Sequence, residues 1–311
     1  MKKITLLFFV FVSINCFAQM DSIPVQKSNH FQTAGRVIKN SVLSVPGDFT
    51  EMGHTVSCDW KRTALYAGGI VGLIATDKIT TGFLHDHIEP TVNYSLPKID
   101  VIKTGIDWAQ GNNAYMLYPI LGLYAGSLVA NHEKGQQVAV NAVKSITYSY
   151  VISHLFLKTI FARNRPQRPV NGNEPAEAPW TKDNWDFGNF HRPYIQSRAD
   201  GTAFPSFHAT FYFSVAKVFQ MEYNNYWIPY TIATGVFLAD IKGHNHWVSD
   251  LLVGGLVGTI IGKSVVNSSR KQIAKNNGTA VIENPKKFRM QKQLVPTISS
   301  SLVGFHFVGS F

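Results

Sequence analysis

Six apolar stretches of 10 to 17 residues dominate the middle of this 311-residue chain and limit what it can fold into. Each carries at most one charged residue, and they are rich in Gly and Ala and separated by Pro, Asn or charged residues. Apolar runs of this length favour helices over strands, and small residues let two helices approach closely. We therefore predict an all-α, multi-helix bundle. The six stretches are residues 63–76, 114–130, 145–157, 209–218, 223–239 and 251–262.

None of these stretches reaches the ~18 continuous apolar residues that predict a transmembrane helix. The mean hydropathy of the chain is −0.01, which is low for a protein that lies mostly in a membrane. The pattern fits either a buried helical bundle or short, weakly apolar membrane helices. Hydrophobic residues make up 45% of the chain, enough apolar surface to exclude a mainly disordered protein.

The net charge of +10 invites a nucleic acid or an anionic lipid as a partner. Residues 1–18 hold +2 of it and residues 263–292 hold +7, which leaves +1 for residues 19–262. The body of the protein is therefore nearly neutral and contains no nucleic-acid motif, so we expect no nucleic-acid partner. The basic segment is either a solvated linker or a contact for anionic lipid head groups.

The N-terminus has the features of a secretory signal peptide: two lysines, a short apolar run over residues 4–12, and Ala18 before the expected cut. The run is too short for a membrane anchor. We predict cleavage after Ala18 and export to the periplasm or the cell-envelope membrane, with the active site facing the periplasm. Cleavage leaves Cys58 as the single cysteine, which excludes an internal disulfide.

Composition divides the chain into four segments. A long loop rich in Pro, Asn and Trp, from Arg165 to Ala203, interrupts the helical part, and such loops are usually functional. The last residues alternate, with Val303, Phe305 and Phe307 on one face, which predicts a strand and favours a small hairpin. The segments are the signal peptide (1–18), a polar lead-in with few signals (19–59), the helical domain (60–266), and a basic linker with a strand-like tail (267–311).

Lys158 and Arg165 form the first of three polar blocks beside the apolar stretches. They are seven residues apart, two helical turns, so we expect both on one face of a helix that Pro166 ends. Two cations at a helix end commonly do no more than complement the helix dipole. By itself this pair is a weak signal of an anion site.

The second block contains Ser206 and His208 at the start of an apolar stretch. Pro205 and Ser206 begin a helix, with Ser206 as the predicted N-cap. Free backbone N–H groups at a helix start bind anions, and His208 is placed to exchange a proton with a bound oxyanion. The alternative is a capping Ser followed by an ordinary His.

The third block contains His246 and Asp250. They are four residues apart, so they are neighbours if both lie on a helix. A carboxylate beside an imidazole fixes the tautomer of the ring and stabilises the charge that the ring gains when it attacks. The alternative is a surface pair.

Together, Lys158-x6-Arg165-Pro166, Pro205-Ser206-Phe207-His208 and His246-x3-Asp250 resemble the signature of the type 2 phosphatidic acid phosphatase / vanadium haloperoxidase superfamily. The resemblance covers about residues 60–266. It implies an all-helical bundle of that kind and a phosphatase that acts on a phosphate monoester or diphosphate. In the phosphatase branch of the family the reaction uses no metal and no other cofactor. It also implies a reaction that passes through a phosphohistidine.

The resemblance implies a role for each matching residue. Lys158 and Arg165 hold the phosphate oxygens, and Ser206 and the backbone N–H of Phe207 add hydrogen bonds. Clustered cations suit this task because phosphate is a dianion that binds most strongly to charged donors.

Three further residues would carry the chemistry. The resemblance makes His246 the nucleophile, and Asp250 orients it and stabilises its charge. His208 protonates the leaving alcohol and then activates water. An alkoxide is a poor leaving group and needs an acid, and a covalent intermediate divides one difficult displacement into two easier ones.

Two positions depart from the family pattern. Phe207 replaces the usual Gly, a change that is tolerated if the side chain points away, because the role there belongs to the backbone. Ala239-Asp240 replaces the usual Ser-Arg, so the Arg that normally contacts phosphate is missing. Four residues are candidates for the lost cation, and Lys242 is the nearest in sequence. The candidates are Lys242, Arg163, Arg192 and His244.

The sequence leaves four kinds of function open. The leading one is a phosphatase for a lipid phosphate such as phosphatidic acid, phosphatidylglycerol phosphate, undecaprenyl diphosphate or a lipid A phosphate, at a membrane surface or in a bilayer. A soluble phosphomonoesterase resembling the class A bacterial acid phosphatases is the second. A vanadium haloperoxidase, with vanadate on His246, and a non-catalytic envelope protein that kept the fold are the others.

The acidic residue at position 240 can be tested directly. Replacing Asp240 by Arg is expected to raise the affinity for phosphate or leave it unchanged, because a carboxylate repels the dianion unless it points elsewhere. Inhibition by inorganic phosphate, compared with the wild type, measures the change. A large loss of activity would show that Asp240 has a positive role.

Overall fold

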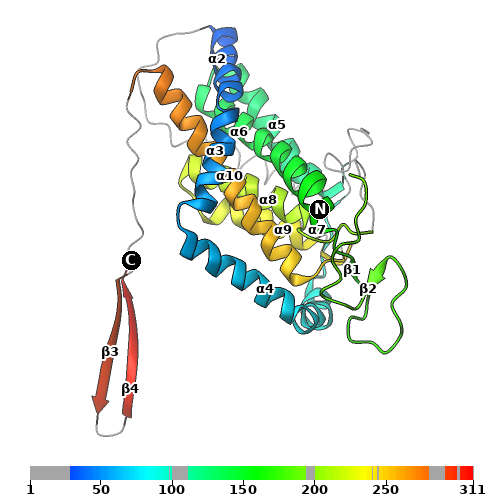
Figure 1. The fold of residues 1–311 in the computed structure, drawn as a ribbon. Helices are drawn as coiled ribbons and strands as arrows, with labels where there is room; N and C mark the ends of the chain where they lie inside the picture. The colour runs from blue at the N-terminus through cyan, green and yellow to red at the C-terminus, as the bar shows by residue number, and fades with distance from the viewer. Residues whose placement is uncertain are drawn as a thin grey trace. The chain divides into compact units, whose positions relative to one another are not determined.

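The computed structural model describes residues 29–97, 99, 111–193, 200–239, 241–243, 245–279, 291–299 and 302–310, the last two ranges by their backbone alone. The helices in Figure 1 confirm the predicted all-α fold. The chain divides into two units between Gln272 and Ile273. The predicted signal peptide, residues 1–18, lies outside the described residues.

Helices make up most of the described elements. In chain order these elements are α2 (His30–Leu43), α3 (Val45–Ser57), α4 (Trp60–Phe83), the π-helix η1 (Leu84–Ile88), the 3-10 helices η2 (Glu89–Thr91) and η4 (Gly111–Asn113), α5 (Ala114–Val129), α6 (Glu133–Tyr148), the π-helix η5 (Ser149–Leu157), α7 (Lys158–Phe161), β1 (Arg165–Pro166), β2 (Trp180–Thr181), α8 (Phe207–Tyr223), α9 (Trp227–Ala239), the 3-10 helix η6 (Ile241–Gly243), α10 (Val248–Asn276), β3 (Gln291–Ser299) and β4 (Leu302–Ser310).

The predicted apolar stretches lie in helices, although the ends of those helices differ from the ends of the stretches. Residues 63–76 fall inside α4, and residues 145–157 cover the end of α6 and all of η5. The stretch 223–239 is interrupted, because Asn224 adopts a left-handed conformation (φ 52°) that ends α8. Asn tolerates this conformation better than most residues do.

Two segments with weak helical signals are also helical. α2 and α3 lie in the predicted lead-in, and α10 continues to Asn276, ten residues into the predicted linker. The large apolar residues of α2 do not mark its packed face, because small and polar side chains make up most of its buried surface while Phe31 and Val42 are exposed. That helix packs on α6, where Arg36 pairs with Glu133 at 2.7 Å. The buried residues of α2 are Thr33, Val37, Asn40 and Ser41.

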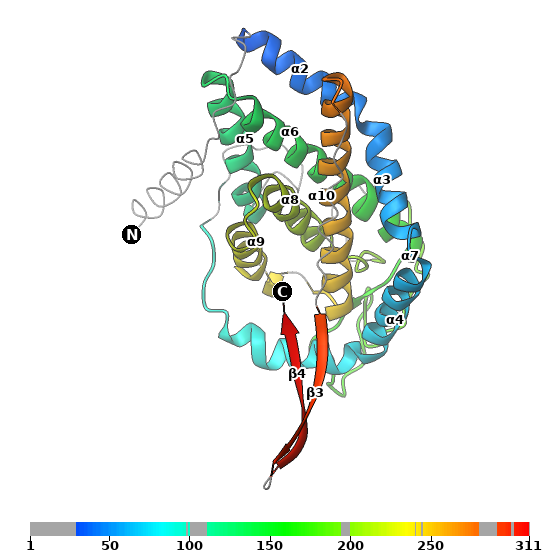
Figure 2. The ribbon, with the colours of Figure 1, turned by 90° about the vertical axis from the view of Figure 1, so that its left-hand side faces the viewer.

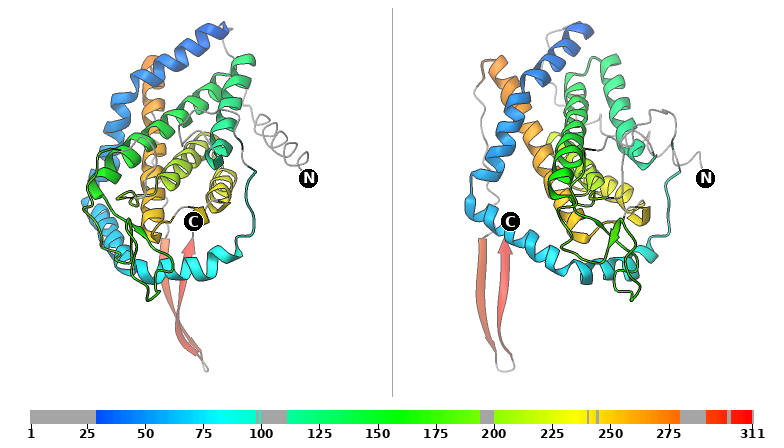
Figure 3. Two further views of the ribbon diagram at one scale, coloured as in Figure 1. Left: turned by 90° about the vertical axis from the view of Figure 1, so that its right-hand side faces the viewer. Right: turned by 45° about the vertical axis from the view of Figure 1, so that its right-hand side comes forward.

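α8 lies at the centre of the helical unit. Figures 2 and 3 show α6, α9 and α10 around it. The largest hydrophobic cluster joins Ile120 of α5, Ile146 of α6, Phe211 of α8 and Val236 of α9, all of them buried. Full burial of each such side chain stabilises the fold by about 1.5–3 kcal/mol, so this cluster fixes the position of α8.

Three glycines on one face of α10 let this helix lie directly against α8. Gly254, Gly258 and Gly262 are four residues apart and therefore form a stripe. A Cβ atom at Gly258 would overlap the carbonyl oxygen of Thr210, and one at Gly254 would overlap that of Ser206. The close helix approach predicted from the small residues is confirmed, and it brings the start of α8 beside the start of α10.

The outer helices expose large apolar side chains. Leu65 and Ile79 of α4 are 74% and 75% exposed, and Trp227 of α9 is 83% exposed. Among the helices in the described part of the chain, α10 alone is long and apolar enough to cross a membrane, and half of its apolar stretch is buried inside the protein. Exposed apolar surface therefore lies on several outer helices, with α4 contributing the most large side chains, whereas α10 contributes to the core.

The C-terminal unit contains an antiparallel hairpin of β3 and β4, with Gln291 opposite Ser310 and Ser299 opposite Leu302. The predicted hairpin is confirmed, and its first strand begins four residues before the alternating segment 295–311. The expected shared face of Val303, Phe305 and Phe307 lies outside the described side chains.

The glycine stripe leads to a stability prediction. Gly258→Ala is expected to lower the free energy of unfolding by about 1–3 kcal/mol, because its Cβ overlaps a backbone oxygen of α8 and forces the two helices apart. Gly255→Ala is the matched control, since its Cβ meets the Phe213 ring at an ordinary 3.7 Å. Ala in place of Gly inside a helix otherwise stabilises by about 0.5–1 kcal/mol. Urea denaturation measures both, and equal stabilities would contradict the close approach.

Candidate active site

His246 and Asp250 lie at the start of α10. The helix begins at Val248, so His246 lies in the loop before it, and the prediction that both residues belong to one helix is wrong. They are nevertheless neighbours, with Nδ1 of His246 3.3 Å from Oδ2 of Asp250. The same oxygen accepts a hydrogen bond from the Trp247 backbone N–H at 2.9 Å. Both side chains are buried, which excludes a surface pair.

Lys158 and Arg165 do not share a helix face, so that prediction is also wrong. α7 ends at Phe161, because Ala162 adopts a left-handed conformation (φ 44°) before Pro166 is reached. Arg165 instead lies in β1, opposite Trp180 of the parallel strand β2. Both cations are almost completely buried, so they are not a solvated helix end. The guanidinium of Arg165 donates to the hydroxyl of Thr202 at 3.3 Å.

Ser206 is the N-cap of α8, as predicted. Its hydroxyl accepts a hydrogen bond from the Ala209 backbone N–H at 3.5 Å. The backbone N–H of Ser206 donates to the carbonyl oxygen of Asp250 at 2.9 Å, which ties the second polar block to the third. The side chain of Phe207 packs in the core against Tyr150 and Phe211, so its bulk is accommodated away from the helix start.

His208 lies in the first turn of α8, half-buried. Its Nε2 atom is 3.4 Å from the side-chain nitrogen of Asn113, and the Asn113 oxygen accepts a hydrogen bond from the Tyr212 hydroxyl at 2.8 Å. Asn113 precedes α5 and has no signal in the sequence that links it to His208. It is a residue that sequence reasoning missed, and it helps to orient the imidazole.

The charges of Lys158, Arg165 and Asp250 act on one another. The pKa of Lys158 is lowered to about 7, mainly by burial and also by the positive charge of Arg165, while the negative charge of Asp250 acts in the opposite direction. A dianion bound beside Lys158 would favour its charged form. Two buried cations whose charges are only partly balanced therefore make a site suited to an anion such as phosphate.

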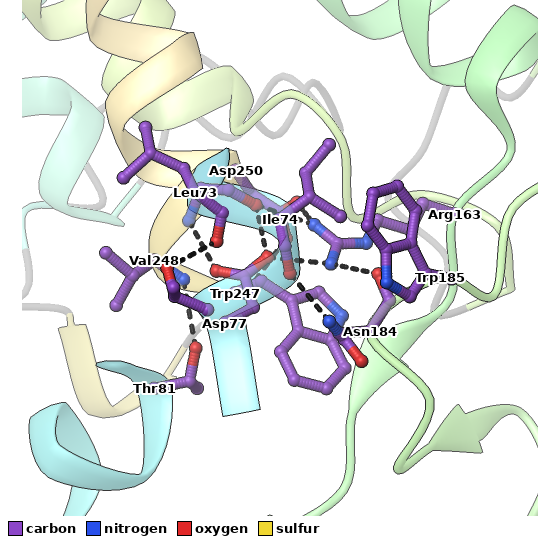
Figure 4. Close-up of polar contacts among 12 residues, drawn as sticks. Leu73, Ile74, Asp77, Thr81, Arg163, Asn184, Trp185, Trp247, Val248 and Asp250 are labelled. Carbon is purple, nitrogen blue, oxygen red and sulfur yellow. Dashed lines mark hydrogen bonds and ion pairs between the residues drawn. The ribbon is translucent and has the colours of Figure 1, made fainter. Parts of the chain in front are cut away.

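Arg163, one of the candidates for the lost cation, lies behind Asp250, in a role that sequence reasoning did not predict. Arg163 is completely buried, and its guanidinium donates to Oδ1 of Asp250 at 2.7 Å and to Oδ2 of Asp77 at 2.8 Å. Figure 4 shows this guanidinium pointing toward both carboxylates. The rings of Phe187 and Trp247 lie over it, at 4.9 and 5.0 Å from its central carbon. The contacts connect α4 with the loop after α7 and with α10.

One signal in the sequence could have revealed Asp77. Thr81 follows Asp77 by four residues, so the two form a short polar stripe on one face of the largely apolar α4, and Glu89 lies farther along the chain in η2. All three side chains are buried, and Thr81 accepts a hydrogen bond from the Val248 backbone N–H at 3.1 Å. A buried polar group must have partners, so such a stripe predicts a polar neighbour for α4.

Glu89, in the 3-10 helix η2, anchors the loop before His246. Arg168 binds its carboxylate with two hydrogen bonds of 2.6 and 3.0 Å. The same guanidinium donates to the side-chain oxygen of Asn245 at 2.7 Å. Arg168 follows the first polar block by three residues, and it links that block to the residue directly before His246.

The structure describes three of the four candidates for the lost cation. The amine of Lys242 donates to the carbonyl oxygen of Val92 at 2.7 Å, and that contact holds the side chain at the surface. Arg163 is paired with two carboxylates, and Arg192 is exposed. His244 and Asp240 lie outside the described residues. Within the described ranges, no group of three His, Cys, Asp or Glu side chains is arranged to hold a metal ion.

The low pKa of Lys158 predicts how anion binding depends on pH. In Lys158→Arg the charge persists at high pH, whereas wild-type Lys158 loses its proton as the pH rises through about 7. The affinity for inorganic phosphate, relative to that of the variant, is therefore expected to fall about tenfold per unit above pH 7. Calorimetry measures this ratio, which cancels the titration of phosphate itself.

Lys217→Arg is the matched control. Lys217 is a partly buried lysine of α8 whose pKa is also lowered by burial, but its amine donates to Gln220 at 2.7 Å. The phosphate affinity of the Lys217→Arg variant, divided by that of the wild type, should not change with pH. A constant ratio for Lys158→Arg as well would contradict a role for Lys158 in binding the anion.

The chain is 36% identical over 74 residues to a protein named lipid A 1-phosphatase from Porphyromonas gingivalis (strain ATCC 33277). That similarity covers 21% of this chain and only 17% of the length of the relative. No solved structure shows a significant match to the chain.

A wider match comes from the family comparison. Residues 139–274 match the PAP2 superfamily, and this range begins in α6 and ends in α10. It contains Lys158, Arg165, His208, His246 and Asp250, so all three polar blocks lie within it. This match and the similarity to the lipid A 1-phosphatase support the resemblance of the chain to the type 2 phosphatidic acid phosphatase superfamily, and the helical bundle agrees with it.

Proposed function

We propose that this protein is a phosphatase that hydrolyses a phosphate monoester or a diphosphate of a lipid through a phosphohistidine on His246. The observation that carries the proposal is the buried contact between His246 and Asp250, 3.3 Å long, beside two buried cations. A carboxylate in this place keeps the proton on Nδ1 and leaves the Nε2 lone pair for attack. Neither a metal ion nor another cofactor enters the proposed reaction.

In the first step, Nε2 of His246 attacks phosphorus, and the bond from phosphorus to the leaving oxygen breaks. His208 gives its proton to that oxygen, so the leaving group departs as an alcohol. Asp250 stabilises the positive charge that the imidazole gains. Lys158 and Arg165 hold the phosphate oxygens, with the Ser206 hydroxyl and the backbone N–H of Phe207 as further donors.

In the second step, His208 takes a proton from water as the water oxygen attacks phosphorus. The bond between phosphorus and Nε2 breaks, and its electron pair returns to His246. Phosphate leaves, and both histidines regain their starting protonation. Each step is easier than direct hydrolysis, because a positioned imidazole replaces water as the first nucleophile.

The relative with the lipid A 1-phosphatase name supports a phosphorylated lipid as the substrate class. The exposed apolar side chains of α4 and α9 support work at a membrane, where such surface is covered by lipid. We further propose that the protein is exported and acts in the periplasm or at a membrane of the cell envelope. The proposed leader, residues 1–18, supports export.

The function is tested by comparing His246→Ala with the wild type on phosphatidic acid, a lipid A phosphate and p-nitrophenyl phosphate. His246→Ala is expected to lower kcat about a thousandfold or more, because the nucleophile is gone. His54→Ala, an exposed histidine of α3, is the matched control and should keep full activity. Equal rates for His246→Ala and the wild type would eliminate this site as the catalytic one.

The role of His208 can be separated from that of His246. His208→Gln is expected to slow phosphate release from a lipid phosphate by about 10²–10⁴-fold. The loss in the first step should be smaller with p-nitrophenyl phosphate, whose leaving group needs no acid. With ³²P-labelled substrate, rapid quenching should then trap a base-stable phosphohistidine, because the second step still lacks its base.

A further inference from the structure

Three buried side chains, Arg163, Ser249 and Asp77, form a connected network behind Asp250, and the proposed reaction does not use these three directly. Arg163 donates to Asp250 at 2.7 Å, to the Ser249 hydroxyl at 2.8 Å and to Asp77 at 2.8 Å. Asp77 also accepts the Ser249 backbone N–H at 2.9 Å and the Ser249 hydroxyl. Figure 4 shows Asp77, Arg163 and Asp250 converging on this network.

The charged side chains of the network are buried away from water, so their charges interact strongly with one another. The side chains of Asp77, Arg163 and Asp250 are 0% exposed. Charges in such surroundings interact much more strongly than charges at the surface do, since little water screens them. A change of charge at Asp77 therefore reaches His246 through Arg163 and Asp250.

The balance of charge decides the direction of the effect. Arg163 shares its single positive charge between two carboxylates, so the three groups together carry a net charge of −1. Burial raises the pKa of Asp77, whereas the hydrogen bonds that it accepts from a guanidinium, a backbone N–H and a hydroxyl act in the opposite direction and favour its ionised form. Without Asp77, Arg163 would neutralise Asp250 completely and weaken its support for a positive imidazole.

We propose that Asp77 and Arg163 are positioning residues that set the basicity of His246 through Asp250, with Asp77 preserving the negative charge that Asp250 presents to the imidazole. The proposal rests on the proposed function in that it takes His246 as the nucleophile. Asp77 belongs to α4 and lies outside the residues 139–274 that match the family. An element beyond the family match thus tunes the nucleophile.

Other charged groups face the same site and must stay constant in a test. They come from different elements: Lys158 from α7, Arg165 from β1 and His208 from α8. Arg168 and Glu89 reach the loop through Asn245. All of these groups are present in every variant below, so a difference between variants reports the network alone.

The test compares the acid limb of the pH profile of kcat/KM, where protonation of His246 stops the reaction. Asp77→Asn changes the net charge from −1 to 0, which favours the neutral imidazole, so the limb should move about one unit to lower pH. Arg163→Gln changes the net charge to −2 and should move the limb about one unit to higher pH. Opposite shifts are a readout that simple loss of packing does not produce.

Thr81→Val is the matched control. Thr81 is on the same face of α4 as Asp77, is equally buried and binds the start of α10, but it carries no charge. This variant should lose stability and leave the limb where it is. The shifts are measured only on variants that unfold in a cooperative thermal transition and are therefore folded. If one of the two variants Asp77→Asn and Arg163→Gln does not fold, the shift of the other tests the proposal by itself.

Titration of the His246 ring by ¹⁵N NMR gives the same answer without substrate. His246 is assigned by its absence in His246→Gln, and the ring pKa should fall in Asp77→Asn and rise in Arg163→Gln. Unchanged or parallel shifts would overturn the coupling even if the enzyme is active. If no substrate is hydrolysed, the proposed function fails, while the NMR shifts still test the network.

Discussion

The Arg163 guanidinium is the interaction on which the rest of the site depends. It joins a carboxylate of α4 to a carboxylate of α10 and comes itself from the segment after α7. Three parts of the chain that are far apart in sequence are therefore held by one buried cation. Removing one member of such a group leaves an uncompensated charge in the interior, which is strongly unfavourable. Its geometry in turn fixes the carboxylate that supports His246.

A second constraint is the close contact of α8 and α10. The glycine stripe removes the side chains that would separate the two helices, so that their N-terminal ends meet. The hydrogen bond from the Ser206 N–H to the Asp250 carbonyl follows from this contact. The packing of α8 against α10 thus brings together the helix start that is suited to an anion and the histidine that is suited to attack.

Much of this could be predicted from the sequence. Apolar stretches of helical length predict the all-α fold, and Ser206 predicts the start of α8, because capping and periodicity are local properties. The contact between His246 and Asp250 is expected from a shared helix, and it forms although His246 lies in the loop before α10. The same rule failed for Lys158 and Arg165, because a left-handed residue at Ala162 ends the helix and the chain returns Arg165 to the site through a short strand pair. Spacing predicts a contact only while the backbone stays regular.

The sequence by itself determined the class of the fold and the chemical types gathered in the site, because residue order and helical periodicity are sufficient for both. Only the tertiary structure decided which charges meet. Arg163, a candidate for the lost phosphate contact, is instead committed to Asp77 and Asp250, and Lys242 is held by Val92. Asp77 lies 86 residues before Arg163, and no local pattern relates the two. Electrostatic pairing acts through space, so only folding could reveal it.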